Sequence, residues 1–96
     1  MRSPVFMYPP NWGILATVMR MQKVYVRIVV EFSPEGQATP RRLDFHDHWY
    51  DIDHLIRVER GAPQTGGGGF LRYTVKIWGQ TRYLWRDGDQ WFVEVT

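Results

Sequence analysis

The 96-residue sequence contains no cysteine and only two serines. Disulfides, cysteine-ligated metal ions and thiol nucleophiles are therefore excluded. Small secreted domains more often carry cysteines, so we expect this chain to work in a reducing cytoplasm. Neither serine fits a nucleophile elbow, because Ser3 lies in an N-terminal tail and Ser33 precedes a proline.

Long apolar runs are equally scarce. No stretch approaches the roughly 20 apolar residues of a membrane-spanning helix. Pro9, Pro10 and Gly13 interrupt the apolar stretch near the N-terminus, so we expect neither a secretion signal nor membrane association. The net charge of +2 falls short of the strongly basic surface that is typical of nucleic-acid-binding proteins.

Aromatic residues, by contrast, are abundant. Hydrophobic residues make up 44% of the chain and aromatic residues 16%, against 23% charged residues, and this balance indicates a folded chain. The length suits one domain. A period-two pattern begins at Lys23, so we assign residues 23–96 to a small β domain. Residues 1–22 form an N-terminal extension, and we predict that its removal does not unfold the β domain.

The first half of the domain predicts a three-stranded meander. Residues 23–32 alternate between apolar and polar or smaller side chains, as a half-buried strand does. A tight turn at Asp47–His48 would place Phe45 opposite Tyr50. The alternation slips near Asp53–His54, which indicates a bulge before the third strand continues.

The second half predicts a second three-stranded meander after a glycine-rich loop at residues 61–69. Gly79–Gln80 suits a type II′ turn and Asp87–Gly88 a type I′ turn. The two turns together bring three apolar residues to one face: Val75, Leu84 and Trp91. Neither meander can bury its apolar face alone. The predicted fold is therefore all-β, with the two meanders packed as a small sandwich or a partly open barrel.

One cluster of histidine and aspartate bears on metal binding. Asp44, His46, His48 and Asp51 are residue types that bind zinc, iron or manganese, but their spacing matches no metal motif. The alternative is a ladder of opposite charges across neighbouring strands, in which arginines such as Arg27 and Arg42 relieve the repulsion between the two aspartates. We prefer the ladder and expect no cofactor.

The order of these features resembles small bacterial domains of unknown function, some of which occur near DNA-damage-tolerance genes. The resemblance is carried by five features of residues 23–95: Val30-Glu31-Phe32, Pro40, the aromatic hairpin 43–52, Arg72-Tyr73 and Trp91-Phe92-Val93. It implies a bacterial β domain and brings no established activity. Several relatives carry a tryptophan pair before the fourth strand, where this chain has four glycines.

No nucleophile, acid–base pair or phosphate-binding loop is recognisable, so we expect a binding module rather than an enzyme. The candidate binding face interleaves cations with flat rings, as a stacking surface does: Arg72, Lys76, Trp78, Tyr83, Trp85 and Phe92. Its ligand would be single-stranded nucleic acid or a peptide. Alternatively the face is covered, by the N-terminal segment or by a second copy in a self-associating structural domain.

Overall fold

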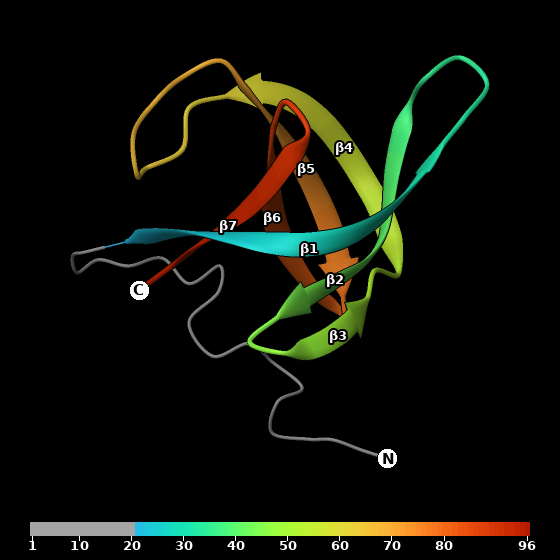
Figure 1. Cartoon of the computed structure of the whole chain (residues 1–96), viewed down its shortest axis with the longest axis horizontal. Coiled ribbons are helices and arrows are strands. Elements are labelled where there is room, and N and C mark those ends of the chain that lie inside the picture. The colour runs from blue at the N-terminus through green and yellow to red at the C-terminus, as the bar shows by residue number, and fades with distance from the viewer. Residues whose placement is uncertain (1–20) are drawn as a thin grey trace.

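The computed structural model describes residues 21–96, which form one antiparallel sheet of seven strands (Figure 1). The strands are β1 (Gln22–Phe32), β2 (Ala38–Phe45), β3 (His48–Asp51), β4 (His54–Gly61), β5 (Phe70–Ile77), β6 (Gln80–Asp87) and β7 (Gln90–Val95). This part of the chain contains no helix, and so none that could cross a membrane. The all-β prediction is confirmed.

The sheet curls into a half-barrel that is closed at one corner. Its order is β3-β2-β1-β7-β6-β5-β4, so two consecutive strands lie at opposite edges. The Ile52 N–H donates to the Arg41 carbonyl of β2, and the Asp53 N–H donates to the Lys76 carbonyl of β5, both at 2.8 Å. Adjacent residues thus bind opposite edges of one sheet. Of the two predicted architectures, this arrangement is the partly open barrel and not the sandwich of two packed meanders. The predicted third strand is divided here into β3 and β4.

Strand β1 links the two halves of the half-barrel. Its first residues pair with β7, as far as Val26 opposite Trp91. From Arg27, opposite Asp44, it pairs instead with β2 on its other edge. The long strand expected over residues 23–32 is therefore present, but each half of it has a different neighbour.

Each predicted hairpin turn is wrong by one residue. The structure turns at residues 46–47, 78–79 and 88–89. His46 and Asp47 have φ of 54° and 62°, and Trp78 and Gly79 have 55° and 75°, so both turns have the double positive φ of type I′. When a hairpin turn is displaced by one residue along the chain, the pairing register of its two strands moves by two residues. Leu43 therefore faces Tyr50, but every side chain stays on its predicted face.

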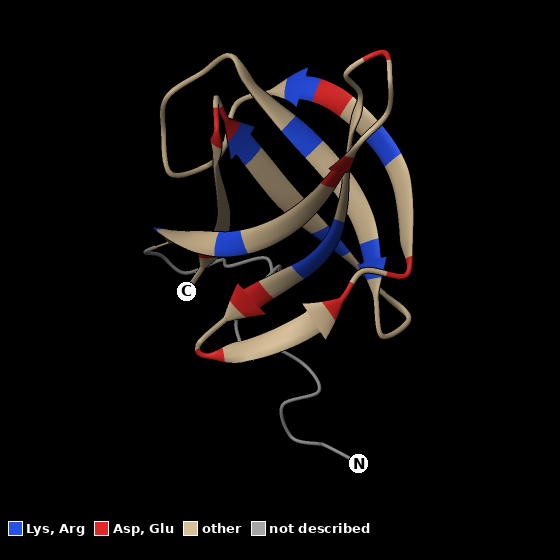
Figure 2. Ribbon diagram, turned by 45° about the vertical axis from the view of Figure 1, so that its right-hand side comes forward, with Lys and Arg blue, Asp and Glu red and all other residues tan. Residues whose placement is uncertain are grey.

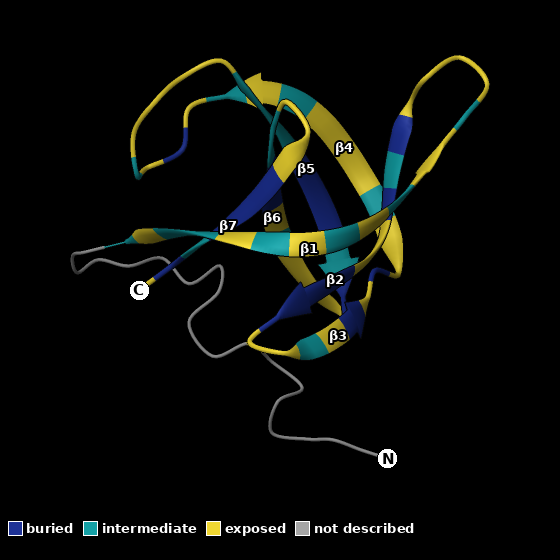
Figure 3. Cartoon of the chain, viewed as in Figure 1, coloured by how far each residue is buried: buried dark blue, intermediate teal, exposed yellow. Residues whose placement is uncertain are grey.

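The main core fills the concave side of the half-barrel, as the dark-blue segments of β5, β7 and β2 indicate (Figure 3). Val75 and Leu84 are fully buried and Trp91 is 5% exposed, all within one cluster. The prediction that these three residues are buried together is confirmed, although their cross-strand partners differ from those expected. The Trp91 ring lies 4.8 Å from that of Tyr73.

Candidate binding groove

The predicted stacking face is divided by the fold, because two of its rings are buried. Trp85 is 3% exposed and Phe92 is not exposed at all. Their rings stack at a centroid distance of 6.1 Å and an interplanar angle of 8°, and Phe70 meets Phe92 edge-on at 5.5 Å. These three rings form a second apolar cluster on the convex side of the sheet, which we call the outer ring cluster.

The glycine-rich segment between β4 and β5 lies against the Phe70 ring of this cluster. The Lys23 ammonium donates to the Gly66 carbonyl (3.2 Å) and lies 4.8 Å from the centre of the Phe92 ring. The Thr65 N–H donates to the Glu94 carboxylate at 2.7 Å. Within residues 21–96, Lys23 lies over Phe92 and Gly61, at the end of β4, lies against Trp85. The predicted cover by the N-terminal segment falls on residues outside those described.

Among the other members of the predicted face, Arg72 and Tyr83 lie together, whereas Trp78 lies apart from them. The Arg72 guanidinium lies 4.4 Å from the ring of the exposed Tyr83 and forms an ion pair with Glu59. This hydrogen bond from Arg72 holds the pKa of the Glu59 carboxyl below its usual value. Lys76 is half-buried nearby, and Trp78 lies apart in the turn between β5 and β6.

The histidine and aspartate cluster contains two arginine–aspartate pairs, as the charge ladder predicts, although Asp44 lies opposite Trp49 and not opposite Asp51. The Arg27 Nε donates to Asp44 (3.0 Å) and the Arg42 Nε donates to Asp51 (3.1 Å). Trp49 lies between the two arginines, whose guanidinium carbons are 5.4 and 5.1 Å from its ring. Within residues 21–96, no three histidine, aspartate or glutamate side chains gather closely enough to hold a metal ion.

A groove lies where the half-barrel fails to close. Strand β4 is an edge strand, and on the opposite side β3 pairs with β2 only from Arg42 onward. The start of β2 and the outer edge of β4 therefore border a hollow of about 320 Å³. Its walls are residues 36–39 on one side and Leu55 and Val58 on the other, above a floor of Leu71, Tyr73 and Arg86.

This hollow continues toward the end of the half-barrel. A second hollow of about 580 Å³ shares Leu71 and Arg86 with the first and extends between Arg60, residues 68–70 and the turn after β6. We call the two together the seam groove. Its apolar walls include Val58, whose exposed fraction of 42% is unusual for an aliphatic residue facing the concave side.

Within residues 21–96, the hydrogen bonds of two arginines of the seam groove go to neutral oxygens. The Arg86 side chain donates to the Gly88 carbonyl (2.9 Å) and to the Tyr73 hydroxyl (3.3 Å), and its guanidinium lies 5.4 Å from the Trp91 ring. Arg60 donates to the Gly69 carbonyl at 2.7 Å. Each described ion pair of the protein involves other arginines.

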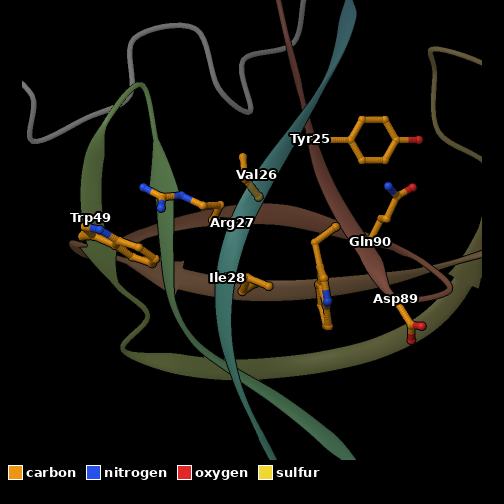
Figure 4. Close-up of a pocket in the computed structure, with 8 residues that line it drawn as sticks. Tyr25, Val26, Arg27, Ile28, Trp49, Asp89 and Gln90 are labelled. Atoms are coloured by element: carbon orange, nitrogen blue, oxygen red, sulfur yellow. The ribbon is translucent and has the colours of Figure 1, made fainter.

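A third hollow, of about 520 Å³, opens where β1 leaves β7 (Figure 4). Tyr25 and Gln90 lie on one side of β1 in this view, and Arg27 and Trp49 on the other. The Tyr25 hydroxyl donates to the Asp87 carboxylate (3.3 Å). Loss of hydration, followed by the charge of Asp87, raises the pKa of Tyr25 above its usual value. The cation that lines this hollow, Arg27, is paired with Asp44, so the hollow offers less to an acidic ligand than the seam groove does.

The sequence did contain a signal for the arginines of the seam groove. Arg86 has the same parity as the buried Leu84, and Arg60 the same parity as Val58. Both arginines thus fall on the core-facing side of their strands. An unpaired charge is unexpected there, because burying a charge without a partner costs free energy.

Comparison with models of protein families, with curated proteins and with solved structures finds no match to this chain. The resemblance to small bacterial domains therefore stays a prediction.

Proposed function

We propose that this chain is a non-catalytic binding module that takes up an extended peptide in the seam groove. The observation that supports this proposal is the pair of strand edges that border the groove, β4 and the start of β2. An extended peptide can add to a free strand edge through backbone hydrogen bonds, while alternate side chains enter pockets. Here every second side chain would point to the floor at Leu71 and Tyr73.

Single-stranded nucleic acid fits these features less well than a peptide. Two of the rings expected to stack on bases, Trp85 and Phe92, are buried. The lysines and arginines are spread over several strands and interspersed with acidic residues (Figure 2), whereas single-stranded nucleic acid is bound along a continuous basic groove. A backbone of phosphates and sugars also cannot reproduce strand pairing.

A second candidate function is self-association through β4, because Ile56 and Val58 are 47% and 42% exposed on this edge. The β4–β5 register shifts between Leu55 and Arg57, so Ile56 is an extra residue in a bulge. Bulges are one means by which edge strands avoid pairing with copies of themselves. The regular stretch beyond it, from Arg57 to Gly61, suits a short peptide better than a long interface between two copies.

The proposal is tested by binding of the full chain to an array of immobilised peptides, each of about six residues, the usual length of a strand. Val58→Lys places a charge in the wall of the groove, and loss of one buried valine contact predicts at least about tenfold weaker binding. Val29→Lys is the matched control, because Val29 is 45% exposed and lies on β1 outside the groove.

Peptide binding that is lost in Val58→Lys and kept in Val29→Lys supports the proposal. Failure of every peptide to bind, or an equal loss in both variants, contradicts it. Single-stranded oligonucleotides serve as a second probe. Salt-sensitive oligonucleotide binding that Val58→Lys strengthens would assign the groove to nucleic acid instead. A mass in solution of twice 11.4 kDa that Val58→Lys halves would assign it to self-association.

A further inference from the structure

We infer that the seam groove selects peptides that carry a carboxylate, which Arg86 and Arg60 would bind. This inference rests on the proposed function and adds the chemical class of the partner. The two arginines flank Leu71 in one row of the concave side, since Arg60 lies opposite Leu71 and Leu71 lies opposite Arg86. Both arginines line the same hollow, at the end of the groove near the turn after β6.

The charge of Arg86 is held on the inner side of the sheet by neutral groups. Its contacts are a carbonyl, a phenol and the rings of Trp91 and Phe32. Packing against rings orients a guanidinium without neutralising it, and two of its five N–H donors at most are used there. An arginine so held is suited to bidentate binding of a carboxylate.

The one acidic side chain that lines this hollow is directed elsewhere. Asp87 accepts a hydrogen bond from Tyr25, which lines neither hollow of the seam groove, and forms none of the described ion pairs. Residues 1–20 contain no aspartate or glutamate. Charge complementarity therefore favours an acidic partner from another molecule over this chain's own N-terminal residues as the occupant of the groove.

The test uses labelled peptides of about six residues, in which valine and threonine alternate around one variable central residue. One peptide has a central glutamate and an amidated C-terminus, a second has a central glutamine and a free C-terminal carboxylate, and a third has a central glutamine and is amidated. Binding to the full chain is followed by fluorescence anisotropy at low and physiological salt. A hydrogen-bonded charge pair predicts about tenfold tighter binding of at least one carboxylate peptide than of the neutral peptide.

The variants Arg86→Gln and Arg60→Gln should remove this tenfold preference while the neutral peptide still binds. Arg42→Gln is the matched control, because it makes the same change in net charge on an arginine that pairs with Asp51 outside the groove. It should keep the preference. Arg86→Lys retains the charge, and it should keep part of the preference even where Arg86→Gln folds poorly.

The arms of this experiment separate the inference from the proposed function. If all three peptides bind equally, the groove is a peptide site without carboxylate selection, and this inference is overturned while the proposed function stands. If Arg42→Gln loses the preference as fully as Arg86→Gln does, the preference reflects net charge and the inference is again overturned. If no peptide binds, the proposed function fails as well. Preference for the second peptide over the first would identify the carboxylate as that of a chain terminus.

Discussion

Replacing Phe92 by alanine should destabilise the domain severely, although this residue lies on the face that the sequence assigns to ligands. Its side chain is fully buried, and rings of Tyr25, Phe70 and Trp85 lie at centroid distances of 5.4, 5.5 and 6.1 Å. Truncation of a buried phenylalanine costs about 3–5 kcal/mol. Each aromatic pair adds about 0.5–1.5 kcal/mol beyond burial.

One effect works in the opposite direction. A loop with four glycines lies against the Phe70 ring, which packs on Phe92, and such a loop can move into part of the cavity and reduce its cost. We therefore expect a loss of about 4 kcal/mol, in the middle of the range for such truncations. The whole domain has a free energy of unfolding of about 5–14 kcal/mol at 0.05–0.15 kcal/mol per residue, so the variant would be close to unfolding.

The measurement is urea unfolding followed by tryptophan fluorescence. With a slope of about 1–3 kcal/mol/M for a small domain, the midpoint should fall by more than about 1 M at an unchanged slope. Phe32→Ala is the matched control, since Phe32 is 58% exposed, and its loss should stay below about 1 kcal/mol. If Phe92→Ala lowers the free energy of unfolding by less than about 1 kcal/mol, Phe92 is not buried as described. That result would favour the prediction that this face binds a ligand.

Three further outcomes can be measured in the same way. Trp91→Ala should cost about 3–5 kcal/mol, because it empties the main core; a midpoint close to that of the wild type would contradict the packing described. Gly67→Ala should cost about 1–2 kcal/mol, since φ is +85° and a Cβ would come within 2.9 Å of a ring carbon, whereas Gly68→Ala meets open space and should be neutral. The ion pair with Arg72 lowers the pKa of Glu59, so its contribution is present above the pKa of the unfolded chain and is lost as the pH falls through the folded value. Glu59→Gln should therefore lower the midpoint at neutral pH, and this effect should shrink as the pH falls below the pKa of an unperturbed glutamate; an effect that does not change with pH would exclude this linkage.

The sequence predicts which face of the sheet a side chain lies on much better than it predicts which residue lies opposite it on the next strand. The hairpins show why. Hydrophobic alternation decides which side of a strand is buried, and this is unchanged when the register moves by two residues. Val75 and Leu84 are therefore correctly assigned to the core. Their partners depend on which two residues form the turn. At Trp78–Gly79 the bulky Trp78 adopts a φ of 55°, where backbone preference alone would not place the turn.

The covered outer ring cluster was beyond single-sequence reasoning for a different reason. The glycine run indicates a flexible connector by composition, but its position depends on side chains that are distant in sequence. Lys23 contacts Gly66 across 43 positions, and Thr65 contacts Glu94 across 29. A partial signal existed: β6 and β7 carry large rings on both faces, for instance Trp91 next to Phe92. Strands that are apolar on both faces are buried on both faces.

The open seam, finally, follows from the path of the chain between β3 and β4. Ile52 and Asp53 bind opposite edges of the sheet through consecutive N–H groups, with no turn between them. The chain therefore passes from one edge to the other without reversing, and β4 cannot fold back to pair with β3. Because the start of β2 and the outer edge of β4 are not paired with each other, their backbone groups are left to water or to a further extended segment. A backbone that supplies both donors and acceptors satisfies two such edges at once, and this is the physical reason for testing peptides first.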